Sequence, residues 1–230
     1  MRLQATLQVR INSMPSIPES ITRHIREGLW SKNPALVGLL GLCPLLAVST
    51  RLVDALAMGL ATTTVLTTSA GLISLLKHRI DHAVRLPLFM LVMATMVTLS
   101  DVFMNALIPD IHRVIGLFIP LIVTNCAILG RIEACAYRQA VPVALWDGFF
   151  MGLGFSWVIC LLAALREILG TGQLFRHAET LFGQVAKDWS LTLIAPFEGM
   201  QMAVLPAGAF VLLGLLLALR NWLLLSRAST

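Results

Sequence analysis

Residues 53–76 read VDALAMGLATTTVLTTSAGLISLL, a stretch in which Asp54 is the only charged side chain. A helix rises about 1.5 Å per residue, so this stretch can cross the roughly 30 Å hydrocarbon core of a bilayer. Further apolar stretches lie on both sides of it, at residues 35–50, 86–108, 114–130, 145–168 and 201–223. Lipid offers no hydrogen-bond partner to backbone amides, and period-two alternation is almost absent, so helices are predicted and a barrel is not. The sequence therefore predicts an all-α integral membrane protein with six transmembrane helices.

The composition excludes an ordinary soluble domain. Of the 230 residues, 57% are hydrophobic and only 13% are charged, and the mean hydropathy is +0.84. A soluble chain of this length needs more charged residues to cover its surface. The net charge of +5 is attributed to basic loops on one side of a bilayer, so nucleic acid is not an expected partner. The four cysteines do not resemble a disulfide framework, because two of them lie inside apolar runs.

The distribution of basic residues predicts the orientation. With the N-terminus inside, twelve Lys and Arg residues fall in cytoplasmic segments and five fall outside, a bias that agrees with the positive-inside rule. The first 33 residues lack the apolar run of a signal peptide, so the first apolar helix is expected to act as its own insertion signal. Both termini are therefore predicted to be cytoplasmic.

The chain is divided into four parts. In the cytoplasmic segment 1–33, apolar residues recur every fourth position from Ile17 to Leu29, which predicts an amphipathic helix on the membrane surface. A mobile tail is the alternative for this segment. Residues 34–110 and 111–224 are predicted to form two units of three spans each, and residues 225–230 a cytoplasmic tail.

Two features indicate that these units are copies of each other. The first and fourth apolar stretches are too short for regular spans and contain helix breakers, among them Gly41, Pro44 and Pro120. The second and fifth stretches open with similar sequences, Asp54-Ala-Leu-Ala-Met-Gly-Leu-Ala and Asp147-Gly-Phe-Phe-Met-Gly-Leu-Gly. Because each unit has an odd number of spans, the second must insert upside down. We predict two inverted three-helix repeats with short broken first and fourth helices, although a chance match is the alternative.

Cys43 and Cys126 occupy equivalent places in the two broken helices. Inverted symmetry would bring them together near mid-depth in the membrane. Thiolates are soft ligands that suit iron–sulfur clusters, zinc or copper(I). A usual 2Fe-2S cluster takes four protein ligands, so a second protein would have to supply the others. The alternative is that each cysteine is a small buried hydrophobe, and the spacing alone favours neither.

The motifs around these cysteines resemble a known family. Asn33-Pro-Ala-Leu-Val, Gly41-Leu-Cys43-Pro44-Leu and Thr124-Asn125-Cys126-Ala-Ile-Leu-Gly are similar to the E subunits of Rnf electron-transport complexes. The D subunits of sodium-translocating NADH:quinone reductases share the pattern. The resemblance runs from about residue 31 to residue 222. The first 30 residues look longer and more basic than the pattern requires.

The resemblance implies a function. Cys43 and Cys126, with two cysteines of the paralogous A subunit, would hold one 2Fe-2S cluster inside the membrane. This cluster would relay electrons in an ion-translocating ferredoxin:NAD oxidoreductase that moves sodium or protons. The A subunit would be the pseudo-symmetric partner, with the B, C, D and G subunits in the same complex of the bacterial cell inner membrane. No nucleotide-binding motif is visible, so this chain is not expected to bind NAD(H).

Other polar residues receive structural interpretations. Cys135 lies past the fourth span, and Cys160 has no partner in the repeat, so neither is expected to bind metal. Asp101, followed by Asn105, is either a site for ion passage or a neutral or paired carboxylate nearer the outer interface, and the second interpretation is preferred. Asp54 and Asp147 are expected to cap helices. Arg131 is expected to anchor its helix at the membrane interface, or else to balance the charge of the cluster.

Two rival functions remain open. Inverted repeats with broken helices are also typical of secondary transporters, which need polar residues for substrate at mid-depth. A purely structural anchor is the other possibility, and its cysteines would be dispensable.

Overall fold

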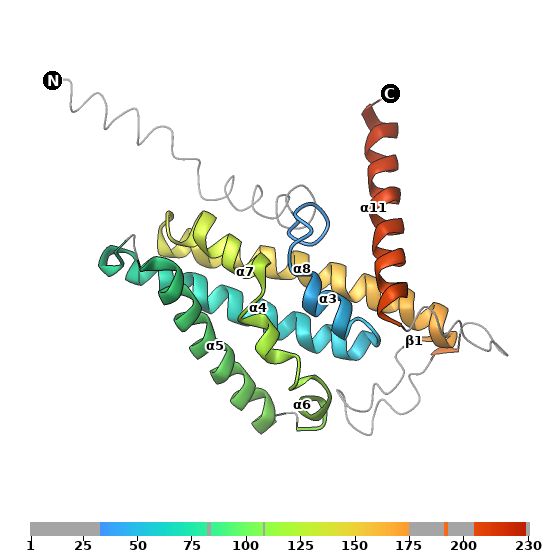
Figure 1. Cartoon of the computed structure of the whole chain (residues 1–230), viewed down its shortest axis with the longest axis horizontal. Coiled ribbons are helices and arrows are strands. Elements are labelled where there is room, and N and C mark those ends of the chain that lie inside the picture. The colour runs from blue at the N-terminus through green and yellow to red at the C-terminus, as the bar shows by residue number, and fades with distance from the viewer. Residues whose placement is uncertain (1–32, 82–83, 108, 175–190, 193–204, 229–230) are drawn as a thin grey trace.

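A computed structural model describes residues 33–81, 84–107, 109–174, 191–192 and 205–228. The predicted surface helix within residues 1–33 and most of the loop after residue 174 lie outside the described residues. The helices are α3 (Leu42–Val48), α4 (Leu52–Leu76), α5 (Arg85–Leu107), α6 (Pro109–Ile115), α7 (Cys126–Arg131), α8 (Val141–Thr171) and α11 (Pro206–Ala228), as Figure 1 shows.

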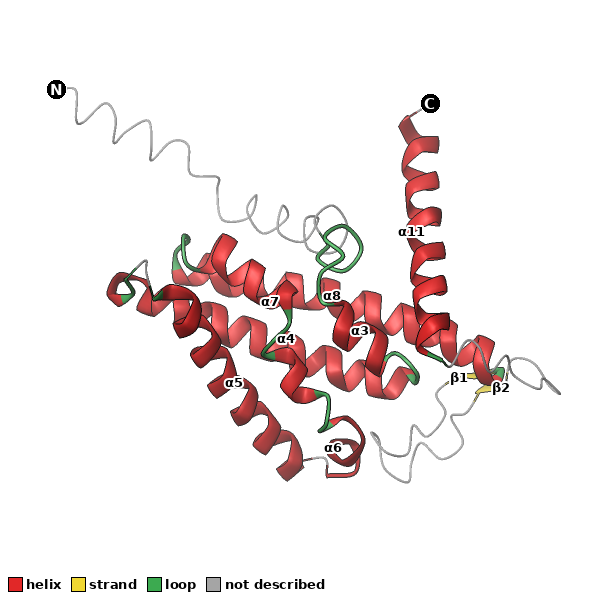
Figure 2. Cartoon of the chain, in the orientation of Figure 1, coloured by secondary structure: helices red, strands yellow, loops and turns green. Residues whose placement is uncertain are grey.

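Shorter elements connect these helices (Figure 2). They are the 3₁₀ turns η2 (Lys77–Arg79) and η3 (Ile119–Ile122), the π-helical turn η4 (Ile132–Ala136), and the two-residue strands β1 (Gln173–Leu174) and β2 (Leu191–Thr192). The strands pair antiparallel, with Gln173 opposite Thr192. The other regular elements of the described part of the chain are helices, as the sequence predicts.

Five segments of the described chain are long and apolar enough to cross a membrane. They are Leu52–Leu76, Arg85–Leu107, Ile119–Ala136, Val141–Thr171 and Pro206–Leu223. The third of these is broken, because the turn η3 ends at Ile122 and α7 begins only at Cys126. These five agree with the second to sixth predicted spans.

The first predicted span, expected as a short broken helix, is not among these five. Residues 35–50 contain no long helix; a turn-rich loop leads to Gly41, and only the seven residues of α3 follow. Gly41 adopts a left-handed conformation (φ +75°), so a helix cannot continue through this residue into α3. The predicted layout of six membrane-spanning helices therefore has a loop and a short helix in its first position.

Helices α4 and α8 pack side by side through small residues at the centre of the molecule (Figure 1). A Cβ atom on Gly59 would lie 2.8 Å from the Ser156 side chain, and one on Gly152 would lie 2.8 Å from the Thr63 Cα. The hydroxyl oxygens of Thr63 and Ser156 are 3.0 Å apart between these glycines. Small residues at a membrane helix contact allow the backbones to approach closely.

The contacts between these two helices are reciprocal. Gly59 packs on Ser156, which follows Gly152 by four positions, and Gly152 packs on Thr63, which follows Gly59 by four positions. At the two ends of the pair, the Ser74 hydroxyl donates to the Gln139 carbonyl just before α8, and the Leu52 amide at the start of α4 donates to Glu167 of α8, 2.9 Å in each case. The end of each helix thus holds the start of the other, so the pair is antiparallel.

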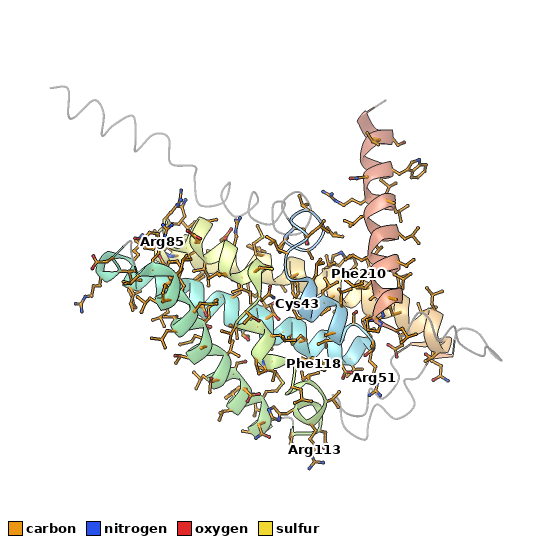
Figure 3. All side chains as sticks on the ribbon, in the orientation of Figure 1. Cys43, Arg51, Arg85, Arg113, Phe118 and Phe210 are labelled. Atoms are coloured by element: carbon orange, nitrogen blue, oxygen red, sulfur yellow. The ribbon has the colours of Figure 1, made fainter. Side chains whose placement is uncertain are left out.

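The outer helices present apolar faces. In α5, Leu91, Leu99 and Phe103 each have more than 60% of their surface exposed. Helix α11 contacts α8 and α3 near its start and then projects away from them, and Phe210 is among its exposed side chains (Figures 1 and 3). Such faces suit lipid or neighbouring membrane proteins.

Candidate functional site

The two broken segments meet at Gly41 and Cys126. The backbone N–H of Gly41 donates a hydrogen bond to the Cys126 Sγ atom over 3.3 Å. Cys126 is the first residue of α7, and the preceding Asn125 caps that helix, its Oδ1 atom accepting from the Ala127 amide at 3.0 Å. The fold therefore brings together two segments that lie 85 positions apart in the sequence.

Close packing explains why position 41 is a glycine. Its φ of +75° is costly for a residue with a Cβ atom, and that atom would lie 2.8 Å from Asn125 Oδ1 and 3.0 Å from Phe155 Cε2. Phe155 belongs to α8, so Gly41 is packed between that helix and the start of α7. The sequence marked Gly41 only as a helix breaker.

Asn33 fixes the start of the loop that leads to Gly41. Its Oδ1 atom accepts hydrogen bonds from the amides of Ala35 and Leu36, and its Nδ2 atom donates to the Gly154 carbonyl of α8 over 2.8 Å. Sequence reasoning missed this role, although the short run Asn33-Pro was the available signal, since Asn often caps a turn through its own side chain.

The cysteines differ in exposure. Cys43, in the first turn of α3, and Cys126, at the start of α7, are both exposed on this chain, whereas Cys135 is buried in η4 and Cys160 is half-buried in α8. Cys43 follows Gly41 by two residues, so their Cα atoms are at most about 8 Å apart. Cys43 therefore lies close along the chain to the Gly41 amide that bonds to Cys126. Figure 3 shows Cys43 near the centre of the molecule, with the charged Arg85 and Arg113 at its edges.

This chain alone offers only part of a metal site. Within the described ranges, no group of three or more His, Cys, Asp or Glu side chains could hold a metal ion. Two exposed thiols fit one half of a four-thiolate iron–sulfur site, and the Gly41 N–H is a donor of the kind that commonly surrounds cluster sulfurs.

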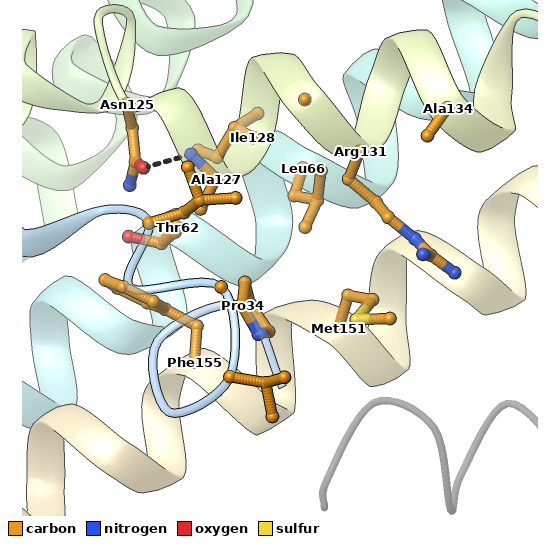
Figure 4. Close-up of a pocket in the computed structure, with 14 residues that line it drawn as sticks. Pro34, Thr62, Leu66, Asn125, Ala127, Ile128, Arg131, Ala134, Met151 and Phe155 are labelled. Atoms are coloured by element: carbon orange, nitrogen blue, oxygen red, sulfur yellow. Dashed lines mark hydrogen bonds between the residues drawn. The ribbon is translucent and has the colours of Figure 1, made fainter. Parts of the chain in front are cut away.

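An apolar pocket of about 300 Å³ lies beside the junction (Figure 4). The loop before α3 forms one wall, α7 and Ala134 of η4 form another, and α4 and α8 contribute Thr62, Leu66, Met151 and Phe155. Asn125 and Arg131 are the strongly polar side chains of its lining. A pocket so poor in polar groups is unsuited to a charged or strongly polar solute.

Arg131 is paired with Asp147. Its Nε atom donates to Asp147 Oδ2 at 2.6 Å, and its Nη2 atom donates to Asp147 Oδ1. The Asp147 side chain is 3% exposed, and it lies six residues inside α8, which begins at Val141. The expectation that Asp147 caps its helix is therefore wrong. Arg131, expected to anchor its helix, forms a partly buried ion pair with this carboxylate. Asp54 lies in the first turn of α4, whose N-cap residue is Arg51.

Comparisons with known proteins agree on the family. The family described as "Rnf-Nqr subunit, membrane protein" matches residues 21–217. The chain belongs to the Rnf-Nqr family of membrane subunits. It is 50% identical over 195 residues to the E subunit of the ion-translocating oxidoreductase complex of Thioalkalivibrio sulfidiphilus, covering 85% of this chain and 86% of the relative. Proteins of the same name from Cellvibrio japonicus and Pseudomonas aeruginosa are 47% identical over 196 residues, covering 85% of this chain and 82% of each relative. The resemblance to Rnf E subunits is thereby confirmed.

Within this Rnf-Nqr chain, Asp101 of α5 is a paired carboxylate. Its Oδ1 atom lies 2.8 Å from Nε2 of His112 in α6, and the two side chains are 38% and 23% exposed. The pairing agrees with the preferred interpretation. Asn105, one turn later, is exposed.

Proposed function

We propose that this Rnf-Nqr protein relays electrons within an ion-translocating ferredoxin:NAD oxidoreductase of the bacterial inner membrane. Cys43 and Cys126 would supply two of the four thiolates of an intramembrane 2Fe-2S cluster, and the paralogous A subunit would supply the other two. Such a cluster, when bound, accepts and passes on one electron at a time. The B, C, D and G subunits would complete the complex, which moves sodium or protons.

The observation that carries this proposal is the junction of the two broken segments. The bond from the Gly41 amide to the Cys126 sulfur brings the two cysteine-bearing segments together, and both cysteines are exposed on the isolated chain. Cysteines kept only for packing are usually buried, as Cys135 is. Two exposed thiols on segments that meet in an apolar region are better explained by ligation.

The backbone around the cysteines supports a shared site. The loop before α3 is non-helical, and Val37, Leu39 and Leu40 within it are 46%, 49% and 37% exposed. Irregular backbone at membrane depth is tolerated where protein or a water-filled cavity covers it, because lipid cannot satisfy its amides. A partner protein seated on this loop would cover the backbone and reach the thiols at the same time. Its presence would also exclude water from the cluster.

The reciprocal contacts of α4 and α8 support the inverted-repeat part of the proposal. In that arrangement, residues 34–110 and 111–224 are related by a half-turn about an axis in the membrane plane, and the axis passes between Thr63 and Ser156. Both termini are proposed to be cytoplasmic, on the distribution of basic residues.

A secondary transporter is the less favoured function. Its substrate site would need polar groups at mid-depth, whereas the pocket beside the junction is lined almost entirely by apolar side chains.

Removing single cysteines tests the proposal in the co-purified pair of this chain and the A subunit. Cys43→Ala and Cys126→Ala should each abolish the iron bound by the pair, because a four-thiolate cluster needs all its ligands. In the whole complex, each substitution should also stop electron transfer. Cys135→Ala and Cys160→Ala are matched controls and should keep both. A Cys43→Ala complex that assembles normally with full iron content and turnover would overturn the relay assignment.

A further inference from the structure

The side-chain amide of Asn125 has an unused hydrogen-bond donor. Its Oδ1 atom accepts from the Ala127 amide, the contact drawn in Figure 4. Its Nδ2 atom is buried and has no hydrogen-bond partner among the described residues, and the residue as a whole is only 2% exposed. Native proteins rarely leave a buried donor unpaired, because its lost hydration is not replaced. The assembled protein is therefore expected to provide an acceptor.

The position of this amide indicates which acceptor. Gly41 contacts both neighbours, since its N–H bonds to the Cys126 sulfur and a Cβ atom on it would lie 2.8 Å from Asn125 Oδ1. The carboxamide and the thiol therefore flank the same glycine. The hydroxyl of Thr62, another polar group in the pocket lining, already donates to the Met58 carbonyl of its own helix.

We propose that Asn125 Nδ2 donates a hydrogen bond to a sulfur atom of the shared cluster and raises the reduction potential of the cluster. This inference rests on the proposed function. Reduction adds one electron to a cluster that already carries negative charge. An N–H donor stabilises the reduced form more than the oxidised form, because hydrogen bonds to a more negative acceptor are stronger. Asn125 is in this sense a tuning residue, and Cys126 remains the ligand.

Two substitutions separate this role from helix capping. Asn125→Ser removes the amide donor but keeps an oxygen that can accept from the Ala127 amide, whereas Asn125→Ala removes both. The experiment is a redox titration of the pair co-purified with the A subunit, followed by electron paramagnetic resonance and by iron analysis. Both variants should shift the cluster to a more negative potential. Only Asn125→Ala should also lower thermal stability, and Asn125→Ser should retain its iron. Asn105→Ser, which removes an exposed amide from α5, is the control and should leave the potential unchanged.

The outcomes distinguish the inference from the proposed function. An Asn125→Ser pair with the wild-type potential would overturn the inference and leave the amide only a capping role. Loss of the cluster in Asn125→Ser, with the control intact, would also overturn it, because the amide would then hold the site together and not tune it. A wild-type pair without any iron signal would contradict the proposed function itself.

Discussion

Gly41 shows how much of the site depends on a missing side chain. Its left-handed backbone and its contacts with Asn125 and Phe155 allow the loop before α3 to meet α7. At this same point, the Gly41 amide reaches the sulfur of Cys126. A side chain here would disturb both the backbone conformation and the hydrogen bond.

The substitution Gly41→Ala should therefore destabilise the protein by about 1–3 kcal/mol, the usual range for a residue held in an unfavourable backbone region. Thermal unfolding in detergent, followed by loss of the monodisperse species, measures the effect. Gly130→Ala in α7 is the matched control, because a Cβ atom there would meet nothing within 4 Å, and alanine favours a helix. Equal stability of the two variants would show that Gly41 is not constrained.

The buried ion pair between Arg131 and Asp147 gives a second prediction at this scale. Asp147→Asn should remove the negative charge that pairs with Arg131 and destabilise the protein by about 2 kcal/mol. This is below the value for a fully buried pair, because the Arg131 side chain is 24% exposed. Asp110→Asn, which removes the exposed partner of Arg113, should leave the midpoint of unfolding unchanged. If both variants unfolded at the wild-type temperature, the pair would have no stabilising role.

Among the helices, α4 and α8 are the central pair against which the broken segments pack. Their glycines allow a close approach, and Asn33 and Phe155 attach the loop before α3 to α8. The position of α8 therefore influences where the loop before α3 meets α7.

Widening this contact should disturb the site at a distance. Gly152→Ala would place a Cβ atom 2.8 Å from the Thr63 backbone, so the helices must move apart, at a cost of about 1–3 kcal/mol. We expect reduced thermal stability and a reduced iron content of the pair with the A subunit. Gly214→Ala in α11 meets nothing within 4 Å and serves as the control. Wild-type stability of Gly152→Ala would mean that the contact is loosely packed.

The sequence predicted these helices well and their ends and partners less well. The stretch 53–76 corresponds to α4, Leu52–Leu76, because its length and hydrophobicity are sufficient to define a span. Helix α8 begins at Val141, earlier than the predicted 145, because Pro142 is tolerated in a first turn and does not block the helix. Asp147 was consequently placed at a helix end by analogy with Asp54.

The candidate site, too, could be predicted only in part from the sequence. The paired cysteines and the breakers at Gly41 and Pro44 were visible as a pattern in the sequence. The contact between the Gly41 amide and the Cys126 sulfur depends on tertiary packing over 85 positions, which local spacing does not encode. The pairing of Arg131 with Asp147 and the buried amide donor of Asn125 were hidden for the same reason.

For the whole molecule, the central claim is that this chain holds half of a cluster. Cys43 and Cys126 are exposed at one junction, and no larger group of metal-ligating side chains occurs in the described part of the chain. Two thiolates leave an iron–sulfur cluster incomplete and open to exchange, so stable binding should require the partner chain.

The most direct test is iron and acid-labile sulfide analysis of three samples, namely this chain purified by itself, the A subunit purified by itself, and the co-purified pair. We expect about two iron and two sulfide per pair, as a single 2Fe-2S cluster requires, and almost none in either chain by itself. A full cluster on this chain without its partner, or a folded pair that contains no iron, would contradict a cluster shared between two membrane proteins.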